Sequence, residues 1–304
     1  MKKQENCRIL GLRGSPMPRK SRQQEPGDIH YVMSHGIDSL NLFETEQDCL
    51  KFQEILQKNF EKYDCRCYGF IFMRNHYHIL IRPSGDTLSL VMRAINNTYA
   101  RYLNKTRQRK GYVFWDRFKS TPTRGLFYVK KLVLYFHANP LRAGIVKNVK
   151  ELYMYYWSSH TAMTKKLNPF PWLNRDYTLS IFSIQEEYDS KDYYHALETY
   201  LHQPKENFNA REKEINRENP EPKLSSQVHD EEAAWVRETV QKAEQRRIMQ
   251  EQLIQQPDII QRLLDASCEA FSLSRENFNE NIKNRTRKIS SVIKLFSYWV
   301  IEKV

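Results

Sequence analysis

The chain has 304 residues, of which 40% are hydrophobic, enough to build one large or two ordinary cores. It contains no apolar run near the ~18 residues that cross a bilayer and no signal-peptide pattern, and its five cysteines show no disulfide spacing, so we expect a cytoplasmic protein without a membrane partner. Lys and Arg outnumber Asp and Glu by 48 to 36, a net charge of +12 that favours a polyanionic partner such as nucleic acid.

The first predicted elements follow a polar, basic N-terminal segment. Residues 1–27 are rich in Pro, Lys and Arg and predict a basic disordered arm. The stretch DIHYVMS, from Asp28, is typical of a strand. A helix is expected over residues 45–63, with Thr45 as N-cap, Asp48 at its third position and an apolar stripe after it.

The next elements complete an alternating pattern. CRCYGFIFM and HYHILIR predict two strands joined tightly around Arg74, and a helix follows Asp86. FKSTPTR is short and β-like, and residues 127–139 predict a third helix that stops before Pro140. The predicted order is strand, helix, strand, strand, helix, strand. This is the order of a ferredoxin-like α+β sandwich, with one helix appended.

The remaining chain divides by composition. We expect the α+β domain to occupy residues 28–165 and an extension over 166–202 to pack on it. Residues 203–228 are polar and charged, as in a linker, and 229–304 predict an all-helical domain.

Two histidines stand one residue apart on the predicted strand HYHILIR. Side chains two apart on a strand share a face, so His76 and His78 lie side by side and could bind a metal ion. Simple packing or hydrogen bonding is the alternative for such a pair. A zinc site shared with Cys65 and Cys67 is disfavoured, because the hairpin register separates the two pairs by ~10 Å or more.

The third predicted helix carries a tyrosine and an amide one turn apart. Tyr135 and Asn139 share a helical face, with Lys131 on the same side, so a phenol and an oxygen ligand could face the histidines. Most of the 18 tyrosines must serve in packing, and spacing alone does not select Tyr135.

Several motifs together resemble a known family. MPRKSR, HYVMSHG, MRNHYHILI, NNTYARYLNK, GYVFWDRFKS, YFHANPLRAGIV and YYWSSH occur in the order found in REP-associated tyrosine transposases, the single-tyrosine HUH transposases of the insertion-sequence-200-like group. The resemblance runs from about Met17 to His160 and implies the ferredoxin-like HUH nuclease fold. Two departures are Arg74, where the family has proline, and the polar helix end FHANP.

The resemblance implies a chemistry for this chain. His76, His78 and Asn139 would hold a divalent metal, Mg²⁺ or Mn²⁺, and Tyr135 would be the nucleophile that forms a 5′-phosphotyrosine. The metal or a nearby basic group must help the phenol lose its proton, and Lys131 is our candidate assistant.

Basic and aromatic residues around the second helix and the fourth strand suit unpaired or hairpin DNA. Phe114 and Trp115 are expected to be buried among them. The candidate DNA-binding residues in this region, with Lys131, are Arg101, Lys105, Arg107, Arg109, Lys110, Arg117, Lys119 and Arg124.

The C-terminal segment suggests a second DNA reader. It resembles the helix-turn-helix of the bacterial replication-initiator C-terminal domain, which would assign Arg285, Arg287 and Lys288 to the DNA. A helical bundle that only packs on the rest of the chain is the alternative.

The sequence thus predicts a bacterial, nucleoid-associated DNA transposase, monomeric or homodimeric, that cuts single-stranded DNA near hairpin-forming repeats. Two alternatives stay open: a non-catalytic DNA-binding regulator that keeps the fold, and a nickase of replication or conjugation.

Overall fold

The computed structural model describes residues 25–123, 125–165, 168–183, 190–203, 226–254, 257–281, 289–293 and 295–296. Its centre is a four-stranded sheet of β1 (Ile29–His35), β2 (Arg66–Met73), β3 (His76–Arg82) and β4 (Lys119–Thr123). The strand order is β2-β3-β1-β4, and all three neighbouring pairs are antiparallel. This order confirms the predicted ferredoxin-like sandwich.

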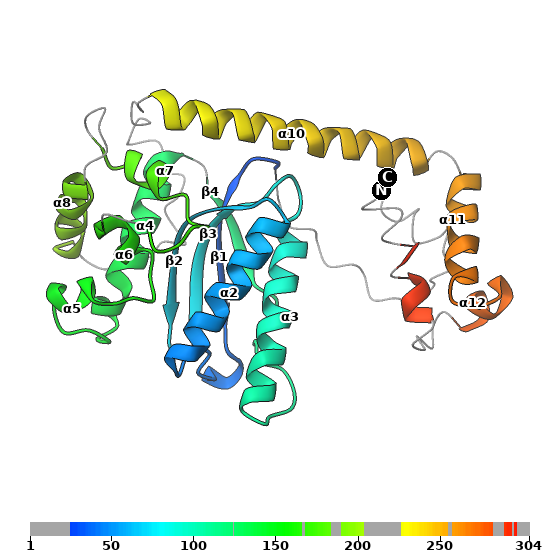
Figure 1. Ribbon diagram of the computed structural model, residues 1–304, viewed down its shortest axis with the longest axis horizontal. Coiled ribbons are helices and arrows are strands. Elements are labelled where there is room, and N and C mark those ends of the chain that lie inside the picture. Colours follow the sequence, from blue (N-terminus) through cyan, green and yellow to red (C-terminus); the bar gives the residue numbers. More distant parts are fainter. Residues whose placement is uncertain are drawn as a thin grey trace.

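Two long helices, α2 (Glu46–Lys62) and α3 (Leu88–Thr106), cover one face of the sheet (Figure 1). The predicted cap of α2 is confirmed, since Thr45 accepts a hydrogen bond from the Asp48 backbone and the Asp48 carboxylate accepts one from the Thr45 backbone. The apolar stripes of both helices are buried, with Phe52 and Tyr99 in ring contact at their centre. A short 3₁₀ turn, η1 (Ile37–Ser39), follows β1.

The opposite face of the sheet receives α4 (Leu126–Arg142), whose Phe136 stacks on His78 from β3. The prediction that this helix stops before Pro140 was wrong, because Pro140 lies inside its last turn. A proline there removes one hydrogen bond, and the end of the helix is closed instead by the amides of Ala143, Gly144 and Ile145.

Among the described residues, four shorter helices pack around α4 and the outer strand β2. They are α5 (Val149–Tyr153), α6 (His160–Thr164), α7 (Arg175–Ser180) and α8 (Ser190–Leu201). The loop before α6 pairs with the edge strand, where the Phe72 amide donates to the Trp157 carbonyl and the Ser159 amide donates to the Phe70 carbonyl. These contacts satisfy backbone groups that an edge strand would otherwise expose.

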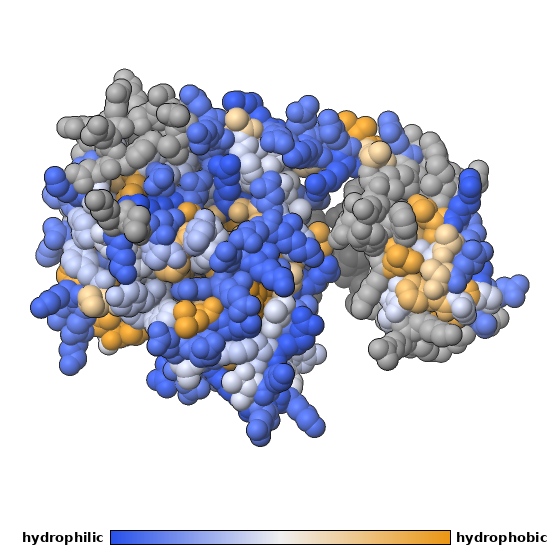
Figure 2. Space-filling model, in the orientation of Figure 1, coloured by the Kyte–Doolittle hydropathy of each residue, from blue (hydrophilic) through white to orange (hydrophobic). Residues whose placement is uncertain are grey.

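The C-terminal part is helical, with α10 (Ser226–Ile254), α11 (Pro257–Glu269) and α12 (Arg275–Asn281). Figure 1 shows α10 running along the α+β domain and beyond it towards α11 and α12. A small second core joins residues of α11 and α12 to the helical residues after them: Leu264, Cys268, Phe278, Ile289 and Val292. In Figure 2, hydrophilic residues predominate over α10, while apolar residues also reach the surface of this C-terminal part.

None of the described helices is long and apolar enough to span a membrane.

Candidate active site

The two histidines of β3 lie on the sheet face that α4 covers. Their rings are 4.9 Å apart between centroids, while Tyr77 between them points to the other face and packs on Phe52 of α2. His78 is buried and His76 is half-buried. The predicted shared face is therefore confirmed, and so is the predicted pairing of Cys67 with Ile81 that separates the cysteines from this pair.

Each imidazole is held by a hydrogen bond at its Nδ1 atom. Nδ1 of His76 lies 2.8 Å from the Asn75 carboxamide oxygen, and Nδ1 of His78 lies 2.8 Å from the Tyr31 hydroxyl. Since a carboxamide oxygen only accepts, the proton of the neutral His76 ring lies on Nδ1. Outer hydrogen bonds of this kind fix the ring orientation and keep Nε2 free to bind a metal.

The helix α4 brings its tyrosine and its amide to the same point. The Tyr135 ring meets the His78 ring edge-on at 5.9 Å, and the Asn139 amide lies 3.5 Å from His78 Nε2. A buried polar group also fixes this helix, because His137 bonds to the Ser159 and Tyr193 hydroxyls, each at 2.7 Å. The structure thus brings together all four residues that the sequence singled out for the active site.

Burial sets the protonation of these groups. It lowers the pKa of His76 to about 4, helped by nearby His35, and it lowers the pKa of His78 well below its usual range, helped by His76. Both rings are therefore neutral near pH 7 and present lone pairs. Burial raises the pKa of Tyr135 above its ordinary value, although a hydrogen bond with Asn139 and the charge of Arg142 oppose the rise.

The donor set fits a divalent metal only if an amide takes part. No group of three His, Cys, Asp or Glu side chains in the described part of the chain is arranged to hold a metal ion. Two neutral imidazoles and the Asn139 carboxamide supply two nitrogens and one oxygen, provided that the Asn139 amide turns, because its nitrogen lies 3.5 Å from His78 Nε2. Imidazole favours Mn²⁺ over Mg²⁺, and carboxamide oxygen suits both.

Residues 29–139 match the model of the family described as "Transposase IS200 like". This segment is an IS200-like transposase domain. The match includes every strand of the sheet, the histidine pair, Tyr135 and Asn139, and it makes DNA transposition the class of function to which the domain belongs. The resemblance stated from the motifs is thereby confirmed for the family.

Two further comparisons accompany the family match. A solved structure of a REP-associated tyrosine transposase bound to a REP hairpin is similar, with 17% sequence identity and a TM-score of 0.42 over 52% of this chain and 92% of that chain. No curated protein matches the sequence.

The predicted DNA-binding residues have different surroundings. Several are exposed: Arg101, Lys105, Lys110, Arg117 and Lys119. Lys131 and Arg109 are half-buried. Four others lie outside the described residues: Arg124, Arg285, Arg287 and Lys288.

Arg107 has a structural partner. Its guanidinium bonds to the buried Asp48 carboxylate at 2.8 Å and to the Asn41 carbonyl, with Glu44 at 3.6 Å. This ion pair joins the end of α3 to the start of α2. The prediction that Arg107 binds DNA stays untested, and the contacts favour a role in the fold.

The predicted burial of Trp115 was wrong, since 68% of this residue is exposed. Its backbone amide donates to the His35 carbonyl, which holds the indole at the surface beside the end of β1. Phe114 is half-buried and packs edge-on against Tyr77.

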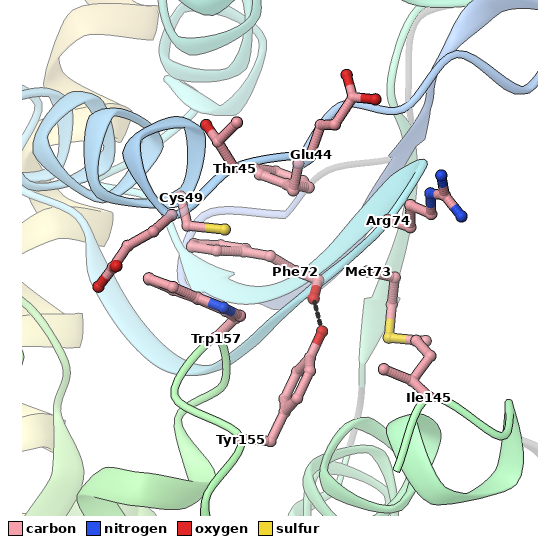
Figure 3. Close-up of a pocket in the computed structure, with 11 residues that line it drawn as sticks. Glu44, Thr45, Cys49, Phe72, Met73, Arg74, Ile145, Tyr155 and Trp157 are labelled. Atoms are coloured by element: carbon pink, nitrogen blue, oxygen red, sulfur yellow. Dashed lines mark hydrogen bonds between the residues drawn. The ribbon is translucent and has the colours of Figure 1, made fainter.

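A larger hollow of about 580 Å³ lies away from the four site residues, between the start of α2 and the loop after α5. Figure 3 shows the Tyr155 hydroxyl bonded to the Phe72 carbonyl at its floor, with Cys49 and Trp157 on its walls. Its lining includes none of the four site residues.

Proposed function

We propose that this protein is a metal-dependent tyrosine transposase that cuts and rejoins single-stranded DNA. The observation that carries the proposal is the meeting of Tyr135 and Asn139, from one turn of α4, with the two histidines of β3. A phenol beside a potential metal site is the arrangement that a covalent attack on a phosphodiester needs.

His76, His78 and Asn139 would hold the metal, Mg²⁺ or Mn²⁺, which when bound would polarise the scissile phosphate and neutralise charge on its oxygens. The Tyr135 oxygen would attack phosphorus in line with the leaving 3′ oxygen. The P–O3′ bond breaks, a bond between the Tyr135 oxygen and phosphorus forms, and the released 3′ oxygen takes up a proton. The product is a 5′-phosphotyrosine that keeps the energy of the phosphodiester for rejoining.

The phenol must lose its proton during this attack. Burial raises the pKa of Tyr135, so the neutral phenol is the resting form, and the positive charge of Arg142 favours the phenolate. Arg142 is held by the Tyr200 hydroxyl at 3.0 Å. We therefore add Arg142 to Lys131 as a residue that assists deprotonation, an assignment that required the structure because Arg142 lies beyond the helix end expected from the sequence.

Hairpin or single-stranded DNA near REP-like repeats is the proposed substrate, and a monomer or homodimer the proposed assembly. The exposed cations of α3, the following loop and β4 would neutralise phosphates, with Lys119 on the same sheet face as His78 through the register Lys119, Met33, His78.

The test is covalent capture. The protein is mixed with a hairpin oligonucleotide carrying single-stranded flanks and Mn²⁺ or Mg²⁺, and protein–DNA adducts are resolved on a denaturing gel. We expect an adduct that disappears on Tyr135→Phe or after chelation of the metal, and persists in Tyr156→Phe, a surface control.

Binding of the hairpin with no adduct and no cleavage would favour the regulator. Cleavage confined to one replication or transfer origin would favour the nickase.

A further inference from the structure

A second site borders the proposed active site on the side of β1 and β4. It is a depression of about 310 Å³ lined by Met33, His35, Asp38, Trp115, Arg117 and Lys119, among others. This volume lies at the lower end of the range for small-ligand sites. His35 joins the two sites, since its ring lies 5.0 Å from the ring of His76.

The indole of Trp115 is presented to this depression by an ordered backbone. The Trp115 amide donates to the His35 carbonyl at 3.0 Å, the Ile37 amide donates to the Val113 carbonyl at 2.9 Å, and Gly36 bridges to Phe114. Yet the Trp115 residue remains 68% exposed. A large aromatic ring fixed at a pocket rim is a platform on which an unpaired base can stack.

Cations lie on the same side. Lys119 pairs with Met33, and Met33 pairs with His78, so the three side chains share one sheet face across three strands. Two strand spacings place the Lys119 and His78 backbones ~10 Å apart. A phosphate next to the scissile one could therefore meet Lys119 or Arg117.

Part of the lining has an unusual backbone. Asp38 and Ser39 are consecutive residues with φ of 46° and 58°, in the left-handed region that few non-glycine residues adopt. Conformations of this kind cost energy and cluster at active sites and ligand-binding sites. Both residues line the depression together with Trp115.

We propose that this depression is a nucleobase pocket, in which a base next to the scissile phosphate leaves the strand and stacks on Trp115. This inference rests on the proposed function for its placement, and it adds the binding of one unpaired base. Trp115 is a substrate-binding residue in this account, with Lys119 and Arg117 binding the flanking phosphates.

The experiment uses the full chain with Tyr135→Phe, so that no strand is cut. The fluorescent base 2-aminopurine is moved through each flank position of a hairpin oligonucleotide. We expect stacking to quench it at one position, next to the phosphate that the wild-type protein cleaves. Trp115→Ala should abolish that quenching and Trp115→Tyr should restore it. Tyr112→Ala is the matched control, since Tyr112 is 82% exposed in the same loop and does not line the pocket.

The affinity for the oligonucleotide provides a second test. Removal of the base at that position, by an abasic site, should weaken binding about fivefold to 150-fold in the Tyr135→Phe protein, the range for one stacked base. In the protein that also carries Trp115→Ala, the same abasic site should not weaken binding any further. Circular dichroism verifies that the variants are folded.

Quenching that survives Trp115→Ala, an equal loss in Tyr112→Ala, or an abasic penalty that Trp115→Ala leaves unchanged would overturn the pocket. Cleavage by the wild-type protein together with one of these results would leave the proposed function intact. Stacking that depends on Trp115, with no strand cut by the wild-type protein, would support the pocket and contradict the proposed function. A chain that binds no single-stranded DNA refutes both.

Discussion

At the scale of single residues, the site depends on neighbours that hold the histidines in place. Tyr31 and Asn75 each bond to an Nδ1 atom, and the Nε2 atom of His78 lies towards Asn139 of α4. Burial raises the pKa of the Tyr31 hydroxyl, so this group remains protonated and can keep its hydrogen bond at any physiological pH. Metal sites lose affinity when such outer partners are removed.

Tyr31→Phe should therefore weaken the binding of Mn²⁺ about 10- to 100-fold, because the His78 ring loses the bond that sets its orientation. Isothermal titration calorimetry with Mn²⁺ measures this directly. Tyr155→Phe is the control, since it removes a hydroxyl that bonds to the Phe72 carbonyl at 2.7 Å, away from the proposed metal site. Equal affinities in Tyr31→Phe and the wild-type protein would contradict the assignment.

Substitutions of two arginines, one in α3 and one just after its end, should separate effects on stability from effects on DNA binding. Arg107→Ala leaves the buried Asp48 carboxylate without its ion pair and should cost about 3 kcal/mol in the free energy of unfolding, measured in urea. Arg101→Ala changes an exposed side chain, so it should leave that free energy nearly unchanged and weaken hairpin binding in low salt. An equal loss in the free energy of unfolding for Arg101→Ala and Arg107→Ala would contradict this assignment of roles.

At the scale of elements, α10 is fastened to the sheet by one buried carboxylate. Glu232 is 3% exposed and accepts hydrogen bonds from Arg66, Arg82, Tyr68 and Asn174. Further along the helix, Trp235 lies over the Arg66 guanidinium. A buried charge with four donors holds α10 against the transposase domain.

Glu232→Ala should release this helix, because it leaves two arginines without their partner, and such a loss costs about 3–5 kcal/mol. Hydrogen exchange should become faster over α10 before it changes in the central sheet. Glu238→Ala is the control on the same helix, where the carboxylate pairs with Lys242 at the surface. Unchanged protection of α10 in Glu232→Ala would show that the carboxylate does not fasten it.

The start of α2 should make the protein sensitive to acid. Burial alone would raise the pKa of Asp48, but the Thr45 and Glu44 amides and Arg107 outweigh it, so the pKa lies below its ordinary value. The resulting stability is fully present above the unfolded value of ~3.9 and is lost as the pH falls through the folded value. Urea unfolding at stepped pH should show a loss below about pH 5 that Asp48→Asn lacks. Parallel pH profiles for the two proteins would contradict this.

At the scale of the whole molecule, local pattern predicted the strands, the first two helices and the Thr45 cap, because each depends on residues close in sequence. The facing histidines followed from strand periodicity. Tyr31 could not be found in this way, since it reaches His78 only through the register of β1 with β3. The contacts of Glu232 with Arg66 and Tyr68 span 166 and 164 positions along the chain, and the exposure of Trp115 depends on a backbone bond to β1.

The central claim is that Tyr135 becomes bonded to DNA. After reaction with a hairpin oligonucleotide and Mn²⁺, the protein is treated with nuclease and protease, and the peptides are sequenced by tandem mass spectrometry. The account predicts a nucleotide joined through its 5′ phosphate to Tyr135, together with a released strand that ends in a 3′-OH. A nucleotide on another residue, or cut DNA with no modified peptide, would contradict it.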